Sequence, residues 1–192
     1  REDYGSALRQ LKALDQRLNE NGVRVFQLGT TASNAGAYDA AIKAFDYIIE
    51  EKGINSGYYI EAKKEALACR RKSVVNDYEF TQAELGELKQ KYIDFLDEFG
   101  RSATTAPILT EFADLYAYYL NDLDAAISIL VEVIAYPGLD RIVLANAKLS
   151  LADFYLMQGE RWESTLLYSQ VDKEFKDDAL GHEARYRNAR LS

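Results

Sequence analysis

Histidine, cysteine, tryptophan and methionine each occur once among the 192 residues, and proline occurs twice. The single thiol, Cys69, can form neither an internal disulfide nor a thiolate zinc cluster. The single imidazole, His182, excludes metal and catalytic sites that need paired histidines. An all-β fold needs a turn signal about every 8–12 residues, and so few prolines disfavour it. The sequence favours long helices, and we expect no metal, no cofactor and no catalytic residues.

The chain also lacks an excess of basic over acidic residues. The chain carries 31 Asp and Glu against 23 Lys and Arg, a formal net charge of −8. Binding to nucleic acid depends on Lys and Arg clusters that release counterions, so nucleic acid is not an expected partner. No apolar run reaches the roughly 18 residues of a bilayer-spanning helix, so direct membrane insertion is not expected. An apolar fraction of 48% is enough to bury a core and excludes a disordered chain.

The motifs of common enzyme classes are absent: a nucleophile elbow, a Walker loop, a zincin helix and a dinucleotide fingerprint. We expect Cys69 to be a buried structural thiol, because free cysteine packs as a small apolar residue. A reactive thiol is the alternative, since basic residues follow at 70–72. We expect Trp162 and Met157, which flank Gly159, to pack between helices.

A short pattern recurs along the chain: a small residue, a branched or long apolar residue, then Leu or an aromatic residue three places on. It is clearest at Ala7–Leu11, Ala41–Phe45 and Ala126–Leu130, with weaker copies from Leu88 and Ser164. These anchors, near 7, 41, 88, 126 and 164, are separated by 34, 47, 38 and 38 residues. Spacing in this range is typical of stacked helix pairs.

Glycine and asparagine positions that stop helices divide the chain into ten segments of helical periodicity. Pro107 suits the first turn of one of them. The predicted helices cover residues 5–20, 22–34, 37–52, 57–78, 81–99, 106–120, 122–136, 139–158, 160–175 and 178–192.

The best copy of the pattern runs from Val25 to Phe45. It reads Leu28-Gly29, then Gly36-Ala37-Tyr38, then Ala41 and Phe45. It resembles a tetratricopeptide (TPR) repeat, which places Leu-Gly in its first helix and Ala-x3-Phe in its second. The resemblance implies an all-α fold, an α-α superhelix or TPR-like solenoid of about five helix pairs, as a single array over residues 1–192.

Two further copies support the resemblance. One matches at Leu151-Ala152, Tyr155, Gly159, Ser164 and Tyr168. The copy around Ala126 keeps its second helix and Pro137, but has Ala113-Asp114 in place of Leu-Gly. From Ala145 to Ser192 the lengthened repeats are similar to those of bacterial envelope TPR proteins, such as outer-membrane-assembly and Tol-associated factors. This similarity implies a bacterial protein of the periplasm or associated with the outer membrane. The helical pattern runs on to Ser192, so we expect a piece of a longer chain.

In TPR proteins the first helix of each pair lines a concave surface where peptides or partner helices bind. Carried over copy by copy, the groove-facing candidates are Phe26, Thr30, Asn34, Glu111, Leu115, Tyr118, Tyr119, Asn146, Asp153, Met157, His182 and Arg185. Phe26 and Thr30 stand where the family's carboxylate clamp has Lys or Arg and Asn, so recognition of a peptide C-terminus is not predicted.

Tyrosine is abundant, with 14 copies, and Tyr116, Tyr118 and Tyr119 lie close together in one expected first helix. Adjacent helical residues point about 100° apart, so these side chains cannot all face one core. Exposed tyrosine is a good contact residue because it offers a large area at low entropic cost.

These features predict a scaffold that binds an unidentified protein or peptide through the concave groove, without catalysis. A structural spacer or a self-association module within a longer solenoid is the alternative, since the helical pattern at 189–191 would leave apolar surface to be covered. An enzyme is a distant alternative. It would need paired carboxylates such as Asp153 and Glu111.

Overall fold

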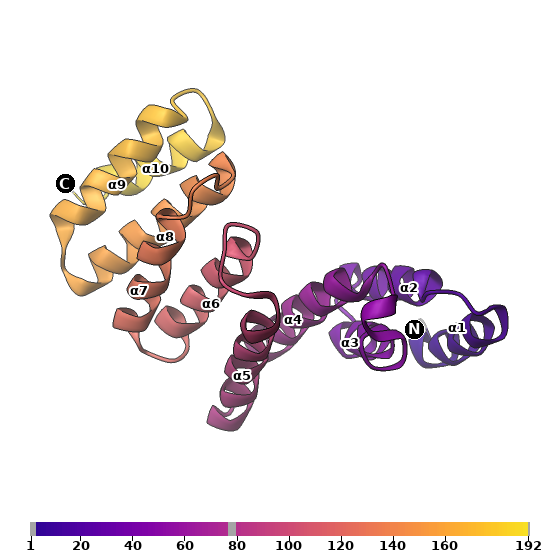
Figure 1. The fold of residues 1–192 in the computed structure, drawn as a ribbon. Helices are drawn as coiled ribbons and strands as arrows, with labels where there is room; N and C mark the ends of the chain where they lie inside the picture. Colours follow the sequence, from indigo (N-terminus) through magenta and orange to yellow (C-terminus); the bar gives the residue numbers. More distant parts are fainter. Residues whose placement is uncertain (1–2, 77–79, 192) are drawn as a thin grey trace. The chain divides into compact units, whose positions relative to one another are not determined.

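The computed structural model describes residues 3–76 and 80–191. Over these residues the regular structure is entirely helical, as predicted, and each predicted range overlaps one α-helix (Figure 1). Residues 77 and 78 of the fourth predicted helix and residue 192 of the last lie outside the described residues. The α-helices are α1 (Tyr4–Leu18), α2 (Val23–Asn34), α3 (Tyr38–Tyr47), α4 (Tyr59–Asn76), α5 (Gln82–Phe99), α6 (Ala106–Tyr118), α7 (Leu123–Ile134), α8 (Arg141–Gln158), α9 (Arg161–Glu174) and α10 (Ala179–Ala189).

Local sequence explains where several helices begin and end. Asp3 caps α1 by accepting a 3.0 Å hydrogen bond from the Ser6 amide, and Asp140 caps α8 through the amides of residues 142 and 143. Asn19 ends α1 with φ of 50°, and Gly159 ends α8 with φ of 92°. Asparagine and glycine tolerate this left-handed conformation, so both ends could be predicted.

The described helices form two compact units, Arg1–Lys91 and Tyr92–Ser192, and the division falls within α5. In the first unit α3 packs between α2 and α4, and α1 packs against α2. In the second unit α7 packs between α6 and α8, and α9 between α8 and α10. A single array over residues 1–192 stays a prediction.

The repeated pattern marks the same buried position in three of its copies, on α3, α7 and α9. Ala41 in α3, Ala126 in α7 and Ser164 in α9 have no exposed surface. The residues four places later are also buried: Phe45, Leu130 and Tyr168. We call α3, α7 and α9 second helices, and α2, α6, α8 and α10 first helices. By its pattern at Ala7–Leu11, α1 is also a second helix.

The close crossing of first and second helices depends on small residues. Gly29 in α2 faces the Phe45 ring of α3, and a Cβ atom placed on Gly29 would lie 2.6 Å from that ring. Phe45 belongs to the core of the first unit, together with Val25, Ala41 and Ile48. The small residue therefore lets the aromatic ring fill the space between the helices.

The predicted helix over 37–52 is interrupted, because α3 ends at Tyr47 and a π-helical turn, η1 (Ile48–Lys52), follows. A short 3-10 turn, η2 (Gly53–Asn55), comes next. The wider turn of η1 carries Lys52 to the buried carboxylate of Asp15 in α1, with 2.5 Å between Nζ and Oδ2. The π-helical turn therefore coincides with an ion pair between Lys52 and a residue of another helix.

The expectation for Trp162 and Met157 is wrong, because both side chains are exposed. Trp162 lies two residues before Ser164, the anchor residue of α9, and is 76% exposed. Leu166 lies two residues after Ser164 and is also exposed. These positions point away from the helix crossing. Their counterparts in the other second helices are polar: Asp39, Lys43, Asp124 and Ser128. Of these three second helices, α9 alone carries large apolar side chains at both positions.

Candidate functional site

The first helices of the second unit form the candidate site, because α8 contacts both α6 and α10. Most predicted groove residues lie on these helices. Glu111, Leu115 and Tyr118 lie on α6, and Tyr119 follows its last residue. Asn146, Asp153 and Met157 lie on α8, and His182 and Arg185 on α10.

Tyr118 and Asp153 are brought together. The Tyr118 ring meets the buried Phe154 ring of α8 edge-on, with centroids 5.6 Å apart, and 53% of Tyr118 remains exposed. Asp153 accepts hydrogen bonds from the Tyr168 hydroxyl of α9 and from Nη1 of Arg187 in α10, the latter at 2.6 Å. Both carboxylate oxygens are therefore engaged, and these bonds tie three helices together.

Burial and nearby carboxylates favour the neutral form of Tyr118. Burial of the ring raises the pKa of Tyr118, and the negative charges of Asp153 and Asp114 raise it further, against the opposing charge of Arg187. The side chain thus presents a neutral hydroxyl, which both donates and accepts hydrogen bonds, on a large apolar ring. Such a side chain can contact a partner through apolar packing and hydrogen bonds, without forming an ion pair.

Some predicted residues are buried or already bonded to other residues of the chain. Leu115 has no exposed surface, because it lies on the core side of α6. Glu111 accepts a 3.1 Å hydrogen bond from the Tyr92 hydroxyl of α5. Arg185 pairs with Asp172 of α9 at 2.6 Å, and this bond lowers the pKa of Asp172. Arg185 therefore faces α9, whereas Arg187 contacts Asp153, and His182 is exposed on α10.

Sequence reasoning missed Arg187. The sequence carried no direct signal for this contact. Asp153 and Arg187 are 34 residues apart, whereas the anchors in this part of the chain are 38 residues apart, so the two residues do not occupy corresponding places on α8 and α10. Arg187 also bonds Glu183 within α10, with 2.8 Å between Nε and Oε1.

The candidates of the first unit lie four residues apart along α2. Phe26 is half-buried, with its ring 5.4 Å from that of Phe45 and 5.1 Å from that of Tyr58. The Thr30 hydroxyl donates to the carbonyl of Phe26, and Asn34 is exposed at the helix end. Much of this surface is thus already used in internal packing.

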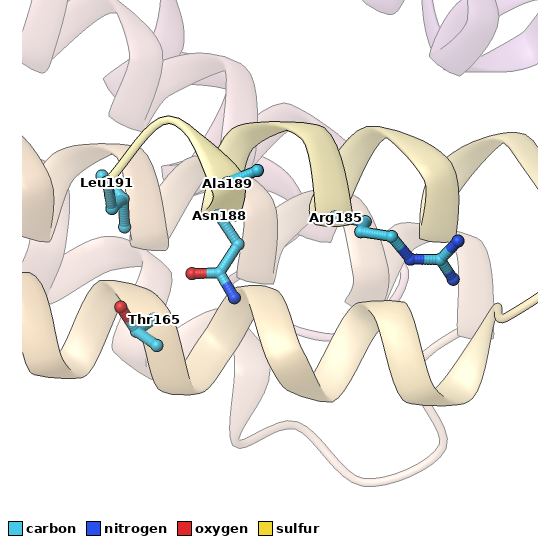
Figure 2. A pocket seen from close by; sticks show the side chains of 5 residues that line it. All are labelled: Thr165, Arg185, Asn188, Ala189 and Leu191. Atoms are coloured by element: carbon cyan, nitrogen blue, oxygen red, sulfur yellow. The ribbon is translucent and has the colours of Figure 1, made fainter.

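A groove lies between α9 and α10 on the same flank as Arg185. Figure 2 shows Thr165 on α9 across from the α10 residues of this flank. The cavity measures about 360 Å³ and is lined by Thr165, Arg185, Asn188, Ala189 and Leu191. Arg185 is the charged member of this lining, and its charge is paired with Asp172.

Little in the described residues suggests reaction chemistry. Cys69 is buried as expected and lies 3.3 Å from the Ser33 hydroxyl, and burial raises the pKa of its thiol. Asp153 and Glu111, the pair that an enzyme would need, are held by different partners. Within residues 3–76 and 80–191, His, Cys, Asp and Glu side chains form no cluster of three suited to a metal ion. None of the described helices is both long and apolar enough to cross a membrane.

No protein-family model and no curated protein matches the chain. Solved structures do match. The chain is similar to TTC0263, a thermophilic TPR protein in Thermus thermophilus, with a TM-score of 0.66 and 17% identity over 98% of this chain and 90% of that one. It is also similar to the MamA protein, with a TM-score of 0.57 and 16% identity over 90% of this chain and 87% of that one. The chain therefore has the all-α solenoid fold of TPR proteins, which confirms the predicted fold class.

Proposed function

We propose that this chain is a protein-interaction scaffold, and that the face formed by α6, α8 and α10 binds a peptide or a partner helix. The observation that carries the proposal is Tyr118. Its ring is more than half exposed, yet it is braced by Phe154 beneath it and stands beside the Asp153–Arg187 pair. A rigid, exposed aromatic side chain on an ordered floor is typical of binding hot spots.

The bonds of Asp153 support this role by preorganising the face. Because Tyr168 and Arg187 both bind Asp153, the three helices α8, α9 and α10 are connected through one carboxylate. A face that is ordered before binding loses less entropy when a partner docks. Met157, exposed near the end of α8, adds a flexible apolar side chain that adapts to different partners.

The neutral Tyr118 hydroxyl and the internal pairing of Arg187 favour a ligand that offers apolar side chains and hydrogen-bonding groups. An isolated charge on the ligand would find no free counter-charge in Arg187 or Asp153. This chemistry fits a peptide or an amphipathic helix, and we propose no reaction at the site.

Selection from a random peptide library, followed by measurement of the dissociation constant, tests the proposal. Peptides selected on the wild-type chain should bind Tyr118→Ala at least ~10-fold more weakly, because hot-spot truncation costs about 2 kcal/mol or more. Tyr186→Ala is the matched control: Tyr186 is 60% exposed on α10 and takes no part in the Asp153 cluster. Selected peptides that bind both variants as tightly as the wild type would refute the assignment of this face.

A further inference from the structure

The loop between α1 and α2 contains the only Asn-Gly sequence of the chain, Asn21-Gly22. In such a sequence the glycine nitrogen can attack the asparagine side chain, because glycine has no Cβ atom to hinder the approach. The nitrogen bonds to Cγ of Asn21, the bond from Cγ to Nδ2 breaks, and ammonia leaves with the proton of the glycine amide. Water then opens the resulting imide and leaves aspartate or isoaspartate at position 21. The reaction changes both the charge and the backbone of the loop.

The fold requires glycine at position 22 despite this reactivity. Gly22 precedes α2 with φ of 89°, a left-handed conformation that other residues disfavour. A Cβ atom on Gly22 would also lie 3.1 Å from the buried Ile48 side chain of η1. Asn21 is exposed, and among the described residues its side-chain amide forms no hydrogen bond. The reacting side chain is therefore open to water and is not held elsewhere.

Buried side chains hold both ends of the peptide group that joins Asn21 to Gly22. The carbonyl oxygen of Asn21 accepts a 2.7 Å hydrogen bond from the Ser56 hydroxyl. The Gly22 amide donates a 2.8 Å hydrogen bond to Oδ1 of Asp15. Asp15 has no exposed surface, and Ser56 is 5% exposed. Because a peptide group is planar, these two bonds fix its orientation, and the Gly22 nitrogen must break at least one of them to turn toward Cγ of Asn21.

The charge of Asp15 opposes the reaction as well. The attack requires the Gly22 nitrogen to give up its proton, and the carboxylate that accepts this N–H disfavours the negative charge that develops on the nitrogen. Asp15 is also a poor base for that proton, because Lys52 and Tyr47 already bind the carboxylate and stabilise its ionised form. We therefore expect Asp15 to slow the reaction.

We propose that Asn21 is a site of spontaneous deamidation, and that Asp15 and Ser56 protect it in the folded chain. The reaction proceeds when the α1–α2 loop opens by local unfolding. Isoaspartate carries the backbone through the side chain and adds a methylene group to it, so the Gly22 amide no longer meets Asp15 and the loop closes less well. The site uses no residue of the α6, α8 and α10 face, and is therefore independent of the proposed peptide site.

Incubation at neutral pH tests the proposal, with proteolysis and mass spectrometry of the peptide that contains Asn21. Asp15→Ala should deamidate at least ~10-fold faster than the wild type, because the Gly22 amide loses a charged acceptor. Ser56→Ala removes a neutral hydrogen bond from the other end of the peptide group and should accelerate the reaction less, by about 3-fold. The wild type unfolded in urea gives the rate of the unprotected sequence, which should exceed that of the folded chain at least ~10-fold.

Gly29→Ala is the matched control for lost stability. It disturbs the α2–α3 crossing of the same unit and leaves the bonds of Asn21 and Gly22 in place. Its deamidation rate should stay within about 3-fold of the wild-type rate. Equal acceleration in Gly29→Ala and Asp15→Ala would overturn the proposal, because stability alone would then set the rate. So would a folded wild type that reacts as fast as in urea, or a slower reaction in Asp15→Ala, which would make the carboxylate a base.

Discussion

The Tyr47 hydroxyl donates a 2.8 Å hydrogen bond to Asp15, a carboxylate with no exposed surface. This bond joins α3 to α1 across 32 residues of sequence. The Gly22 amide and the Lys52 ammonium group complete the site, at 2.8 Å and 2.5 Å. Lys52 also donates to the carbonyl of Glu20, so one buried carboxylate organises the α1–α2 loop and the π-helical turn.

Asp15→Ala should destabilise the first unit by about 3 kcal/mol, because it leaves a largely buried ammonium group and a buried hydroxyl without their acceptor. Tyr47→Phe, which removes one donor and keeps the ring, should cost about 1 kcal/mol. Urea denaturation at neutral pH measures both changes. Equal effects of the two substitutions would show that the ion pair with Lys52 adds nothing.

The same carboxylate should make stability depend on acid pH. Burial opposes ionisation of Asp15, but hydrogen bonds from Lys52, Tyr47 and Gly22 outweigh it and lower its pKa. Its contribution is therefore complete above the unfolded-state pKa of about 3.9 and is lost as pH falls through the lower, folded-state value. Denaturation midpoints measured from pH 7 downward should fall less steeply below about pH 4 in Asp15→Ala than in the wild type. Parallel curves would contradict this assignment.

Gly29→Ala should destabilise the chain by about 2 kcal/mol, despite the better helix propensity of alanine. The new Cβ atom would lie 2.6 Å from the Phe45 ring, which is itself buried, so α2 and α3 must move apart. Gly86→Ala in α5 is the control, since no atom beyond its chain neighbours and its own helix backbone lies within 4 Å of its Cβ position. It should stabilise the chain by about 0.5–1 kcal/mol. Thermal unfolding measures the stability of both variants. A Gly29→Ala variant as stable as the wild type would show that α2 and α3 can move apart without cost.

Gly181→Ala should be more damaging, at about 3 kcal/mol. A Cβ atom on Gly181 would overlap the backbone carbonyl oxygen of Phe175, and a backbone group cannot rotate away as a side chain can. The expected result is loss of α10 docking, seen as faster amide hydrogen exchange over residues 179–189. Gly5→Ala, whose Cβ position meets an atom no closer than 3.5 Å, should leave exchange in α1 unchanged. Unaltered protection of α10 in Gly181→Ala would contradict the close approach.

The helix pairs could be predicted because their determinants are local. Ala41, Ala126 and Ser164 mark a buried crossing within a few residues of sequence, and Gly159 ends a helix through its own backbone freedom. The π-helical turn could not, because the pattern over 37–52 is continuous and the partner of Lys52, Asp15, lies far back in the chain.

The candidate site was harder to predict, because the direction of a helical side chain changes by about 100° with each residue. Arg185 and Arg187 are only two residues apart, yet one pairs with Asp172 and the other with Asp153. The repeated anchor pattern does not extend into α10, so nothing in the local sequence distinguishes the two arginines. Leu115 was misplaced for the same reason, since a small error in the helical phase of α6 turns a core position into a groove position.

Trp162 is the single tryptophan of the chain and stands at the exposed start of α9. Indole emission therefore comes from one known place, about one helical turn before Thr165 in the groove wall. Water around the ring holds that emission at long wavelength, and a helix laid over this end of α9 would shift it to the blue. The protein thus carries its own optical probe, and occupancy of the surface can be followed in solution without a label.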